Sequence, residues 1–378
     1  MYKNIIVDIS GKVPLYDHAL CSALESEYPG TIVLATPFQQ DCYSPKYKVC
    51  RLLRLKRKNG GKMLKAIEGL INYCYLTIKV LLNKYEVIHF QWLPFLEYAS
   101  FERYFLSILK LFSPKSKIIL TQHNVYPHNS SELKKKNYRT KMGKINKVVD
   151  KFVVHTESSK GALIEEFGIS CFKIEVIYHG IFKPDHLPIK NSSDIKTKFL
   201  MFGIQSYYKG TDLLVKAVSS LPKDIRDKIE VTIAGKTDDF LYNDNINLAN
   251  QAGIKWDSRY YTDKELNQLI MDSDVLVFPY RNISQSGALL LALAFGKPMI
   301  VSKLSSFIET LDGFPEDAFI DADSVESLKN AIIVHIDKKQ TVFSQEINII
   351  SELQNKYSWN NSAKKTIRLY NSFNNNKL

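Results

Sequence analysis

Residues 274–302 read D-V-L-V-F-P-Y-R-N-I-S-Q-S-G-A-L-L-L-A-L-A-F-G-K-P-M-I-V-S, and this stretch decides the fold class. The apolar run at each end (274–279 and 298–302) predicts a strand covered on both faces, as in a parallel sheet. Between the two runs, Ser286 predicts the start of a helix and Gly296 predicts its end. A strand, a helix and a second strand in this order predict a parallel βαβ unit.

Apolar, strand-like runs alternate with helix-length segments along the whole chain. This alternation predicts an α/β protein with two doubly wound, Rossmann-like domains facing a central cleft. A linker rich in Pro, Asn and Ser at 181–197 separates the two domains. We therefore predict an N-terminal domain at 1–182, a C-terminal domain at 198–357, and a helix and tail at 358–378 that pack back on the N-terminal domain. The predicted strands are residues 4–9, 31–35, 87–91, 117–121, 152–155, 175–178, 199–202, 230–234, 253–256, 274–279 and 298–302.

Length and composition exclude several classes of protein. The chain has 378 residues, of which 45% are hydrophobic, and this is enough to build the cores of two domains. Asp8 interrupts the first apolar run, so we expect no secretory signal. The longest uninterrupted apolar run, 288–295, is far shorter than a membrane-spanning helix. The five cysteines include no C-x-x-C pair, which favours reduced thiols in the cytoplasm over a disulfide or zinc site.

The excess of positive charge lies in the first half of the chain. The net charge is +12, and residues 1–180 hold 27 Lys and Arg against 15 Asp and Glu, whereas residues 181–378 hold 24 of each. The densest stretch, 46–65, contains nine basic residues and no acid. A charge asymmetry of this kind predicts two surfaces with different partners.

The segment F-G-I-Q-S-Y-Y-K-G-T-D-L-L at 202–214 follows a predicted strand and opens an amphipathic helix. Its loop contains Gly203, Ser206 and Lys209. Glycines let backbone N–H groups approach an anion, and a lysine in the loop supplies a compact positive charge. The segment therefore predicts a phosphate-binding loop, with an ordinary strand-to-helix turn and a solvated lysine as the alternative.

The helix that begins near Ser286 has small residues at its start. Gln285 precedes Ser286, and Gly287 opens the helix. A helix start of this kind offers free N–H groups and the positive end of the helix dipole to a phosphate. The helix is apolar nearly all round, so it must be buried, and the alternative interpretation is a capped core helix without a ligand.

Two histidines, His123 and His128, follow the predicted strand at 117–121. The carboxyl ends of parallel strands are where ligands of such sheets bind. The sequence places no carboxylate beside these histidines and no further ligand at metal-binding spacing, so on their own they define neither a catalytic unit nor a metal site.

Together, the segments 202–214, 274–280 and 284–302 resemble the retaining GT-B glycosyltransferases of family 4, in the subset that has Q-S-G before the helix. The resemblance covers about residues 1–335 and is weaker in the first half, at 87–92, 121–125, 153–157 and 176–180. The sequence departs from the family at the two glutamates of the E-x7-E motif. Their positions hold Ile283 and Leu291, so a family contact to the ribose is missing.

The resemblance implies that a UDP- or GDP-sugar donor binds the C-terminal domain and that a glycan or lipid-linked acceptor binds the N-terminal domain. It implies that Lys209 contacts the donor diphosphate and that His123 reaches the donor sugar, which makes these two the expected catalytic residues. It also implies that the amides of Ser286 and Gly287 hold phosphate oxygens. The expected donor-binding residues are Gly203, Ser206, Lys209, Gln285, Ser286 and Gly287.

The expected activity is transfer of a sugar with retention of configuration, in the synthesis of a bacterial surface polysaccharide. The nucleotide sugar is a substrate, and we expect no cofactor and no metal. A leaving nucleoside diphosphate develops negative charge, which Lys209 and the helix-start amides can stabilise electrostatically.

Four alternatives to a glycosyltransferase have different sequence support. The missing glutamates leave open a non-catalytic subunit that binds nucleotide sugars, which donor binding without turnover would identify. A GT-B nucleotide-sugar epimerase needs a placed acid or base, and the sequence indicates none. The basic charge has no recognition helix or RNA-binding signature beside it, which argues against nucleic acid as a partner. No G-x-G-x-x-G follows the first strand, which argues against a nicotinamide dehydrogenase.

The basic stretch 46–65 is interleaved with Val and Leu residues. We expect Arg51, Arg54, Arg57 and Lys58 to form a patch that holds the protein on the anionic inner face of the plasma membrane, near a lipid-linked acceptor. A solvated loop and helix, or a soluble anionic acceptor, would explain the same charges. The expected location is therefore the cytoplasm, with peripheral attachment to the membrane.

Overall fold

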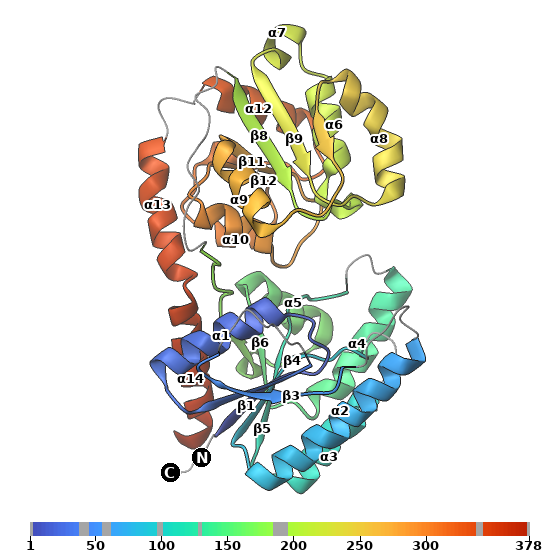
Figure 1. Ribbon diagram of the computed structural model, residues 1–378, viewed down its shortest axis with the longest axis vertical. Helices are drawn as coiled ribbons and strands as arrows, with labels where there is room; N and C mark the ends of the chain where they lie inside the picture. Colours follow the sequence, from blue (N-terminus) through green and yellow to red (C-terminus); the bar gives the residue numbers. More distant parts are fainter. Residues whose placement is uncertain are drawn as a thin grey trace. The chain divides into compact units, whose positions relative to one another are not determined.

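The computed structural model describes residues 3–37, 45–54, 62–96, 101–127, 131–183, 196–337 and 343–375. The chain divides into two compact units (Figure 1). The first unit comprises Met1–Gly180 and Tyr357–Leu378, and the second comprises Ile181–Lys356. Each unit is a parallel sheet with packed helices, which confirms the predicted fold class of two α/β domains.

The sheet of the first unit has, among the described residues, seven parallel strands in the order β3-β2-β1-β4-β5-β6-β7. The strand order reverses between β1 and β4, and such a reversal is where ligands of doubly wound sheets bind. The strands are β1 (Asn4–Asp8), β2 (Ile32–Thr36), β3 (Lys48–Arg51), β4 (Val87–Trp92), β5 (Lys117–Thr121), β6 (Lys151–Val154) and β7 (Ile174–Val176).

Helices cover both faces of this sheet. Alternate residues of each strand point to opposite faces, so each face contributes its own set of buried side chains. On one face, residues such as Ile5 and Phe90 pack with the apolar sides of α2, α3, α4 and α5. On the other face, residues such as Ile6 and Ile119 pack with α1 and α14. The helices are α1 (Pro14–Glu27), α2 (Lys62–Asn83), α3 (Phe101–Phe112), α4 (Glu132–Asn146), α5 (Glu157–Phe167), the short η1 (Cys171–Lys173) and α14 (Trp359–Asn375).

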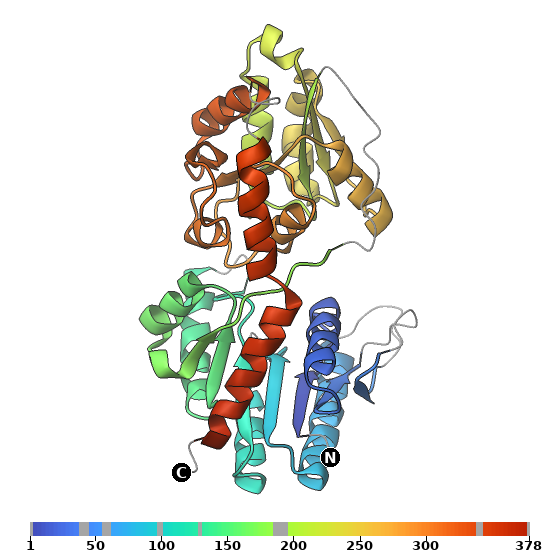
Figure 2. The same cartoon turned by 90° about the vertical axis from the view of Figure 1, so that its left-hand side faces the viewer.

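The C-terminal helix α14 belongs to the first unit although it follows the second unit in sequence. Figure 2 shows it crossing the face of the first sheet. Ile367 is part of the core on that face, and the Tyr370 hydroxyl lies 2.7 Å from Nδ1 of His89 in β4. The Ser362 hydroxyl donates a 2.7 Å hydrogen bond to the carbonyl of Tyr178. These contacts bury α14 against β1, β4, β5 and β6.

The second unit has, within the described part of the chain, six parallel strands in the order β10-β9-β8-β11-β12-β13. The order reverses between β8 and β11. Helix α6 packs against α8 and α12. The strands are β8 (Thr197–Phe202), β9 (Ile229–Ala234), β10 (Lys255–Asp257), β11 (Val275–Phe278), β12 (Met299–Ser302) and β13 (Phe319–Ile320).

The helices of the second unit include the predicted apolar helix, here α10. Its N-cap is Ser286, and Gly296 follows its end with a φ of +64°, as the sequence predicts. The helices are η2 (Tyr207–Lys209), α6 (Thr211–Ser219), α7 (Lys223–Arg226), α8 (Asp239–Gln251), α9 (Asp263–Asp272), α10 (Gly287–Ala294), α11 (Ser305–Thr310), η3 (Glu316–Ala318), α12 (Val325–Asp337) and α13 (Phe343–Lys356).

Three strands differ from the sequence-based expectation. Strand β3 lies inside the basic stretch, where charged residues at a sheet edge hide the apolar alternation. Strand β13 has only two residues, too few to show a pattern. The strand expected at 253–256 begins later, at Lys255, because Gly253 has a φ of +75° and makes the turn before it. Within the described residues, no helix is both long and apolar enough to cross a membrane.

Candidate functional site

The predicted phosphate-binding loop lies at the reversal of strand order in the second sheet. It leaves the carboxyl end of β8 at Gly203, whose φ is +95°, and enters α6 through Gly210, whose φ is +72°. A Cβ atom on Gly210 would lie 2.0 Å from the carbonyl oxygen of Pro279, directly after β11. The glycine therefore lets the loop approach the end of the neighbouring strand.

Lys209 is buried in this loop without a counter-charge. Its side chain is only 8% exposed, and its ammonium nitrogen lies 5.6 Å from the centre of the Tyr280 ring. Among the described residues, no carboxylate comes within ion-pair distance of it. Burial lowers the pKa of Lys209 to about 8. A desolvated ammonium group of this kind is stabilised by an anionic ligand.

The start of α10 supplies further donors. The Ser286 hydroxyl accepts a 3.2 Å hydrogen bond from the N–H of Leu289, while the N–H groups of Gly287 and Ala288 make no hydrogen bond to a described residue. A Cβ atom on Gly287 would meet no atom within 4 Å, so the helix start faces open space. These donors and the helix dipole favour an anion at this position.

Two buried polar atoms lie beside Lys209 and the start of α10 without a partner. The Tyr280 hydroxyl and Oε1 of Gln285 make no hydrogen bond to a described residue. Burial raises the pKa of Tyr280, and the neighbouring Tyr208 raises it further. Buried polar atoms almost always have partners, so their absence here indicates room for a polar ligand. We call the loop 203–210 together with the start of α10 the loop–helix site.

Gly203 and Ser206, both predicted to bind the donor, have contacts within the loop itself. A Cβ atom on Gly203 would lie 3.0 Å from the ammonium nitrogen of Lys209, so the glycine leaves space for that side chain. The Ser206 carbonyl accepts a 2.9 Å hydrogen bond from the N–H of Lys209. Gln205, which was not predicted, is fully buried and donates a 2.8 Å hydrogen bond to the Gly203 carbonyl.

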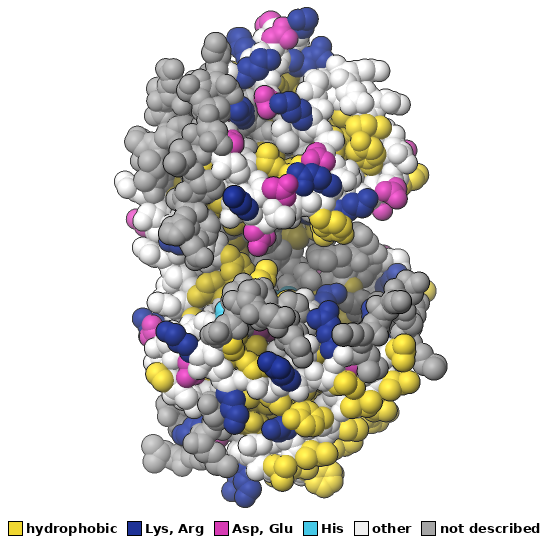
Figure 3. All heavy atoms as spheres, viewed as in Figure 1, with side chains coloured by type: hydrophobic (Ala, Val, Ile, Leu, Met, Phe, Trp, Pro, Cys, Tyr) yellow, Lys and Arg dark blue, Asp and Glu magenta, His cyan; other side chains and the backbone are white. Residues whose placement is uncertain are grey.

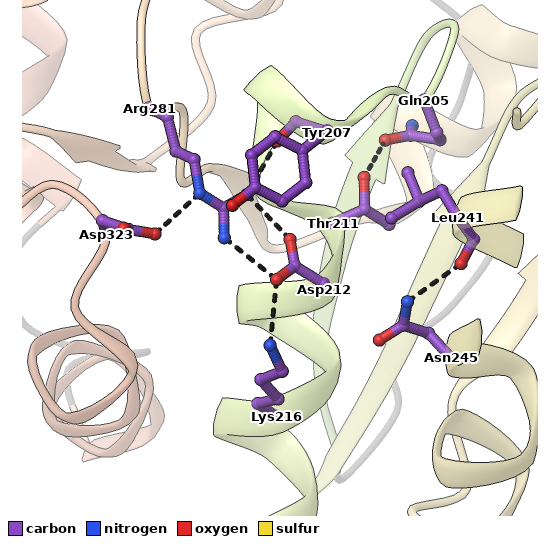
Figure 4. A network of polar contacts seen from close by, with 9 residues as sticks. All are labelled: Gln205, Tyr207, Thr211, Asp212, Lys216, Leu241, Asn245, Arg281 and Asp323. Carbon is purple, nitrogen blue, oxygen red and sulfur yellow. Dashed lines mark hydrogen bonds and ion pairs between the residues drawn. The ribbon is translucent and has the colours of Figure 1, made fainter.

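The structure adds a residue that sequence reasoning missed, Arg281, directly after Tyr280. Its guanidinium forms hydrogen bonds of 2.8 and 2.9 Å with the two carboxylate oxygens of Asp212, and one of 2.6 Å with Asp323 (Figure 4). It also donates to the Tyr207 carbonyl at 2.7 Å and lies over the Tyr207 ring. Two carboxylates already engage this arginine, so it positions the loop. No spacing rule in the sequence pairs it with Asp212.

In the first unit, His123 belongs to a cluster that we call the histidine cluster, formed with His155 and His179. Nδ1 of His123 lies 3.0 Å from Nε2 of His155, and Nδ1 of His155 lies 2.9 Å from the carbonyl oxygen of Ile177. His155 and His179 have ring centroids 5.6 Å apart. All three histidines follow the carboxyl ends of strands β5, β6 and β7.

The hydrogen bonds of the cluster determine its tautomers. Burial lowers the pKa of His155 to about 4, and burial together with the neighbouring histidines lowers the pKa of His123 well below its usual value, so both rings are neutral. The Ile177 carbonyl only accepts, so His155 carries its proton on Nδ1. His155 Nε2 must then accept from His123 Nδ1, which leaves His123 Nε2 as an acceptor. This atom is buried and has no partner among the described residues.

Aromatic rings surround His123. The Tyr16 ring lies 4.9 Å from it, centre to centre, and the Trp92 ring 6.0 Å. The ammonium group of Lys12 lies 5.5 Å from the Trp92 ring. Sequence reasoning singled out His123 but gave no role to His155 or Trp92, although both lie in segments that resemble the family, because each comes from a different strand end and no local pattern joins them. The arrangement can accept a hydrogen bond from a ligand hydroxyl at Nε2 of His123.

Two of the four predicted patch residues can be placed. Arg51 ends β3 and is exposed, and Arg54 is exposed three residues later. Arg57 and Lys58 lie outside the described residues, as does His128.

Comparison with known proteins identifies the second unit. Residues 183–347 match the family described as "Glycosyl transferases group 1". This segment is a glycosyltransferase group 1 domain. An uncharacterized glycosyltransferase of Methanocaldococcus jannaschii is 26% identical over 276 residues, 69% of each chain. A GDP-mannose:glycolipid 4-beta-D-mannosyltransferase of Xanthomonas campestris pv. campestris is 22% identical over 233 residues, 59% of this chain and 62% of that protein.

Solved structures show the fold of the whole chain. The crystal structure of HepE of Anabaena in complex with UDP-glucose has a TM-score of 0.69, at 15% identity over 97% of this chain and 100% of that one. The glycosyltransferase group 1 domain and the sheet of the first unit together have the GT-B fold of such glycosyltransferases.

Proposed function

We propose that this protein is a glycosyltransferase that moves a sugar from a UDP- or GDP-sugar to a glycan or lipid-linked acceptor. One observation carries the proposal: the loop–helix site holds a buried lysine with no carboxylate partner among the described residues, beside helix-start N–H groups that make no hydrogen bond to any of those residues. The glycosyltransferase group 1 domain contains this site. The relatives' names, which include a GDP-mannose-dependent enzyme and a UDP-glucose complex, support a nucleotide-sugar donor.

In this proposal the loop–helix site stabilises the leaving group. As the bond from sugar to diphosphate breaks, negative charge grows on the phosphate oxygens, and in this proposal Lys209 and the N–H groups of Gly287 and Ala288 stabilise that charge. His123 accepts a hydrogen bond from a sugar hydroxyl through Nε2. None of these steps uses a metal or a cofactor.

The finer parts of the proposal come from the resemblance of the sequence to family 4 and, for the location, from its composition and charge. They are retention of configuration, membership of the Q-S-G subset, transfer of a hexose, a role in bacterial surface polysaccharide synthesis, and a cytoplasmic location at the inner face of the plasma membrane. The motifs at 202–214 and 284–302 support the family-based parts, whereas the location is supported by the cysteine pattern and the basic stretch 46–65.

A thermal-shift series with nucleotides tests the donor class. A ligand that binds only the folded state raises the melting temperature, so UDP, GDP and their sugar conjugates should raise it, and UMP and GMP should do so less because they lack the second phosphate. In the Lys209→Ala variant, the melting-temperature shift with a nucleoside diphosphate should be little larger than the shift with the corresponding monophosphate. Equal shifts with UDP and UMP, or no shift with any of these nucleotides, would contradict the proposal.

One observation favours a second candidate, a non-catalytic subunit that binds nucleotide sugars. Ile283 and Leu291 stand where the family has two glutamates, and neither can hydrogen-bond a ribose. Nuclear magnetic resonance of the sugar anomeric signal distinguishes the two functions. Transfer or slow hydrolysis of the bound donor supports the enzyme, whereas binding with an unchanged donor supports the subunit.

A further inference from the structure

The helices α2 and α3 of the first unit present a large apolar surface. Twelve of the 25 exposed large apolar side chains among the described residues lie on these two helices, and we call this surface the α2–α3 face. Figure 3 shows hydrophobic side chains gathered over this part of the unit. The most exposed are Leu70, Ile78, Leu82, Tyr104, Leu111 and Phe112. Contiguous apolar surface of this extent usually marks an interaction site.

The two helices also form a groove. It has a volume of about 480 Å³ and is lined almost entirely by apolar side chains, among them Leu70 and Ile78 of α2 and Tyr104 and Ile108 of α3. The groove lies on the outer side of helices whose opposite sides pack on the sheet, through residues such as Leu76 and Leu106. The fold therefore does not need the exposed side chains for its own core.

The exposed charges of the two helices themselves have one sign. Their acidic residues, Glu68 and Glu102, are both buried, so no described side chain of α2 or α3 is an exposed acid. The exposed basic residues are Lys65 in α2, and Lys84 and Lys115 just after the helices, where the acidic Glu86 is paired with Lys3. Arg103 packs its guanidinium 4.3 Å from the ring centre of Tyr104, so its charge stays near the edge of the apolar surface.

This combination fits a lipid surface better than a protein partner. Reversible protein interfaces are, as a whole, about as apolar as the rest of a protein surface, so they do not need an apolar surface of this extent. A helix that lies in a membrane interface instead has Leu, Ile and aromatic side chains on one side and Lys or Arg around them. Helix α2 has 22 residues, which is long enough to lie along the membrane surface for about 33 Å.

We propose that the α2–α3 face is the surface with which this protein docks on an anionic lipid bilayer, with its apolar side chains among the acyl chains and its lysines at the headgroups. The docking surface is thus a pair of amphipathic helices, and Arg51 and Arg54 play at most a supporting role. The inference deepens the proposed function, because a membrane-docked enzyme reaches a lipid-linked acceptor, but it needs no sugar donor to be tested.

The test is cosedimentation of the full chain with vesicles of neutral lipid, and with vesicles that also contain an anionic lipid. We expect binding to the anionic vesicles that weakens in high salt without being lost, because apolar insertion is not screened. The variant Leu82→Glu/Leu111→Glu should bind at least about tenfold more weakly, since two acids would face the lipid surface. These side chains are 72% and 73% exposed, so the variant should fold normally.

A matched control puts the same change elsewhere in the first unit. Leu133→Glu/Phe172→Glu replaces two apolar side chains that are 70% and 84% exposed and should leave vesicle binding unchanged. Nucleotide-induced thermal shifts of all variants should equal those of the wild type, which separates failure of this inference from failure of the proposed function.

Three outcomes would overturn the inference. One is no binding of the wild type to either kind of vesicle. Another is full binding of Leu82→Glu/Leu111→Glu, above all if Arg51→Glu/Arg54→Glu abolishes binding instead. The third is a lipid-free dimer of the wild type that Leu82→Glu/Leu111→Glu converts to a monomer, which would identify a second copy of the chain as the occupant of the face.

Discussion

The loop–helix site of the second unit and the histidine cluster of the first unit are both buried, but burial acts on them in different ways. Lys209 is a cation without a carboxylate partner among the described residues, and its pKa of about 8 keeps it charged at neutral pH. His123 and His155 have much lower pKa values and are neutral. The first site offers positive charge and the second a hydrogen-bond acceptor.

The difference indicates which chemical group suits each site. A buried cation beside helix-start N–H groups favours phosphate, whose charge offsets the desolvation of the lysine. A neutral imidazole nitrogen among aromatic rings favours a hydroxyl, because it accepts a hydrogen bond without adding charge. A sugar nucleotide carries both groups. The comparison therefore predicts large, charge-dependent effects at the first site and small, pH-independent effects at the second.

Removing the charge of Lys209 should have the largest effect. We expect Lys209→Ala to lower turnover about 100- to 1000-fold, equivalent to about 3–4 kcal/mol, because one preorganised positive group is lost from the leaving diphosphate. Steady-state kinetics at saturating donor measure this. Lys255→Ala, which removes an exposed lysine of the same unit, is the control and should change nothing. If Lys209→Ala lowered turnover only a few fold, the charge of Lys209 would not stabilise the leaving group, and the loop–helix site would not differ from the histidine cluster in the way proposed.

Blocking the start of α10 should have the next largest effect. Gly287 is exposed, and a Cβ atom there would meet no described atom within 4 Å, so Gly287→Val should fold, while its branched side chain would crowd a ligand at the start of α10. We expect nucleoside diphosphate affinity to fall about 10- to 100-fold, as for a lost hydrogen bond to a charged group. Calorimetric titration measures it, with Gly161→Val, another open helical glycine, as the control. Wild-type affinity in Gly287→Val would place the anion elsewhere.

The pH dependence of donor binding sharpens the comparison further. Because the pKa of Lys209 is about 8, the affinity for a sugar nucleotide, whose phosphates do not titrate near neutral pH, should be constant between pH 6 and 8 and fall by up to about tenfold per unit above pH 8. The stability of the unliganded protein should change in the opposite direction with pH. Lys209 titrates near 10.5 in the unfolded chain and near 8 in the folded one, so the unfolded state binds the extra proton between these pH values. The residue therefore makes the free energy of unfolding rise between about pH 8 and 10.5. An arginine stays charged over this range, so the affinity of Lys209→Arg for the donor, relative to its own value at pH 7, should not fall above pH 8. An equal fall in Lys209→Arg would show that a group other than Lys209 titrates.

The smallest effect is expected at the histidine cluster. His123→Ala should lower kcat/KM about three- to tenfold, the value of one neutral hydrogen bond. Between pH 6 and 8 the pH profiles of kcat/KM for the wild type and for His123→Ala should have the same shape, because the pKa of His123 lies well below that range. His335→Ala, a buried histidine of the second unit, serves as the control for lost packing. A histidine-dependent inflection near pH 6.5 would mean that the cluster is charged.

Sequence alone was sufficient for the features that depend on neighbouring residues. The apolar runs of β11 and β12, the N-cap Ser286 and the Gly296 end of α10 all follow from local pattern, and each is present. Lys209 could be singled out because a glycine-rich loop between a strand and a helix is itself a local signal. Strand β3 was not predicted, because an edge strand of four residues with two charged side chains shows no such pattern.

Tertiary structure decided everything that depends on which segments the sheets bring together. The pairing of Arg281 with Asp212 joins residues 69 positions apart, and that of His123 with His155 joins residues 32 apart, so no local rule links them. The tautomer of His123 depends on the carbonyl of Ile177, and the lowered pKa of Lys209 depends on burial. The exposed side of α2 and α3 likewise became visible only once their other side was packed on the sheet. Periodicity and capping act over a few residues, whereas burial and electrostatics act through space, and only the folded chain specifies those distances.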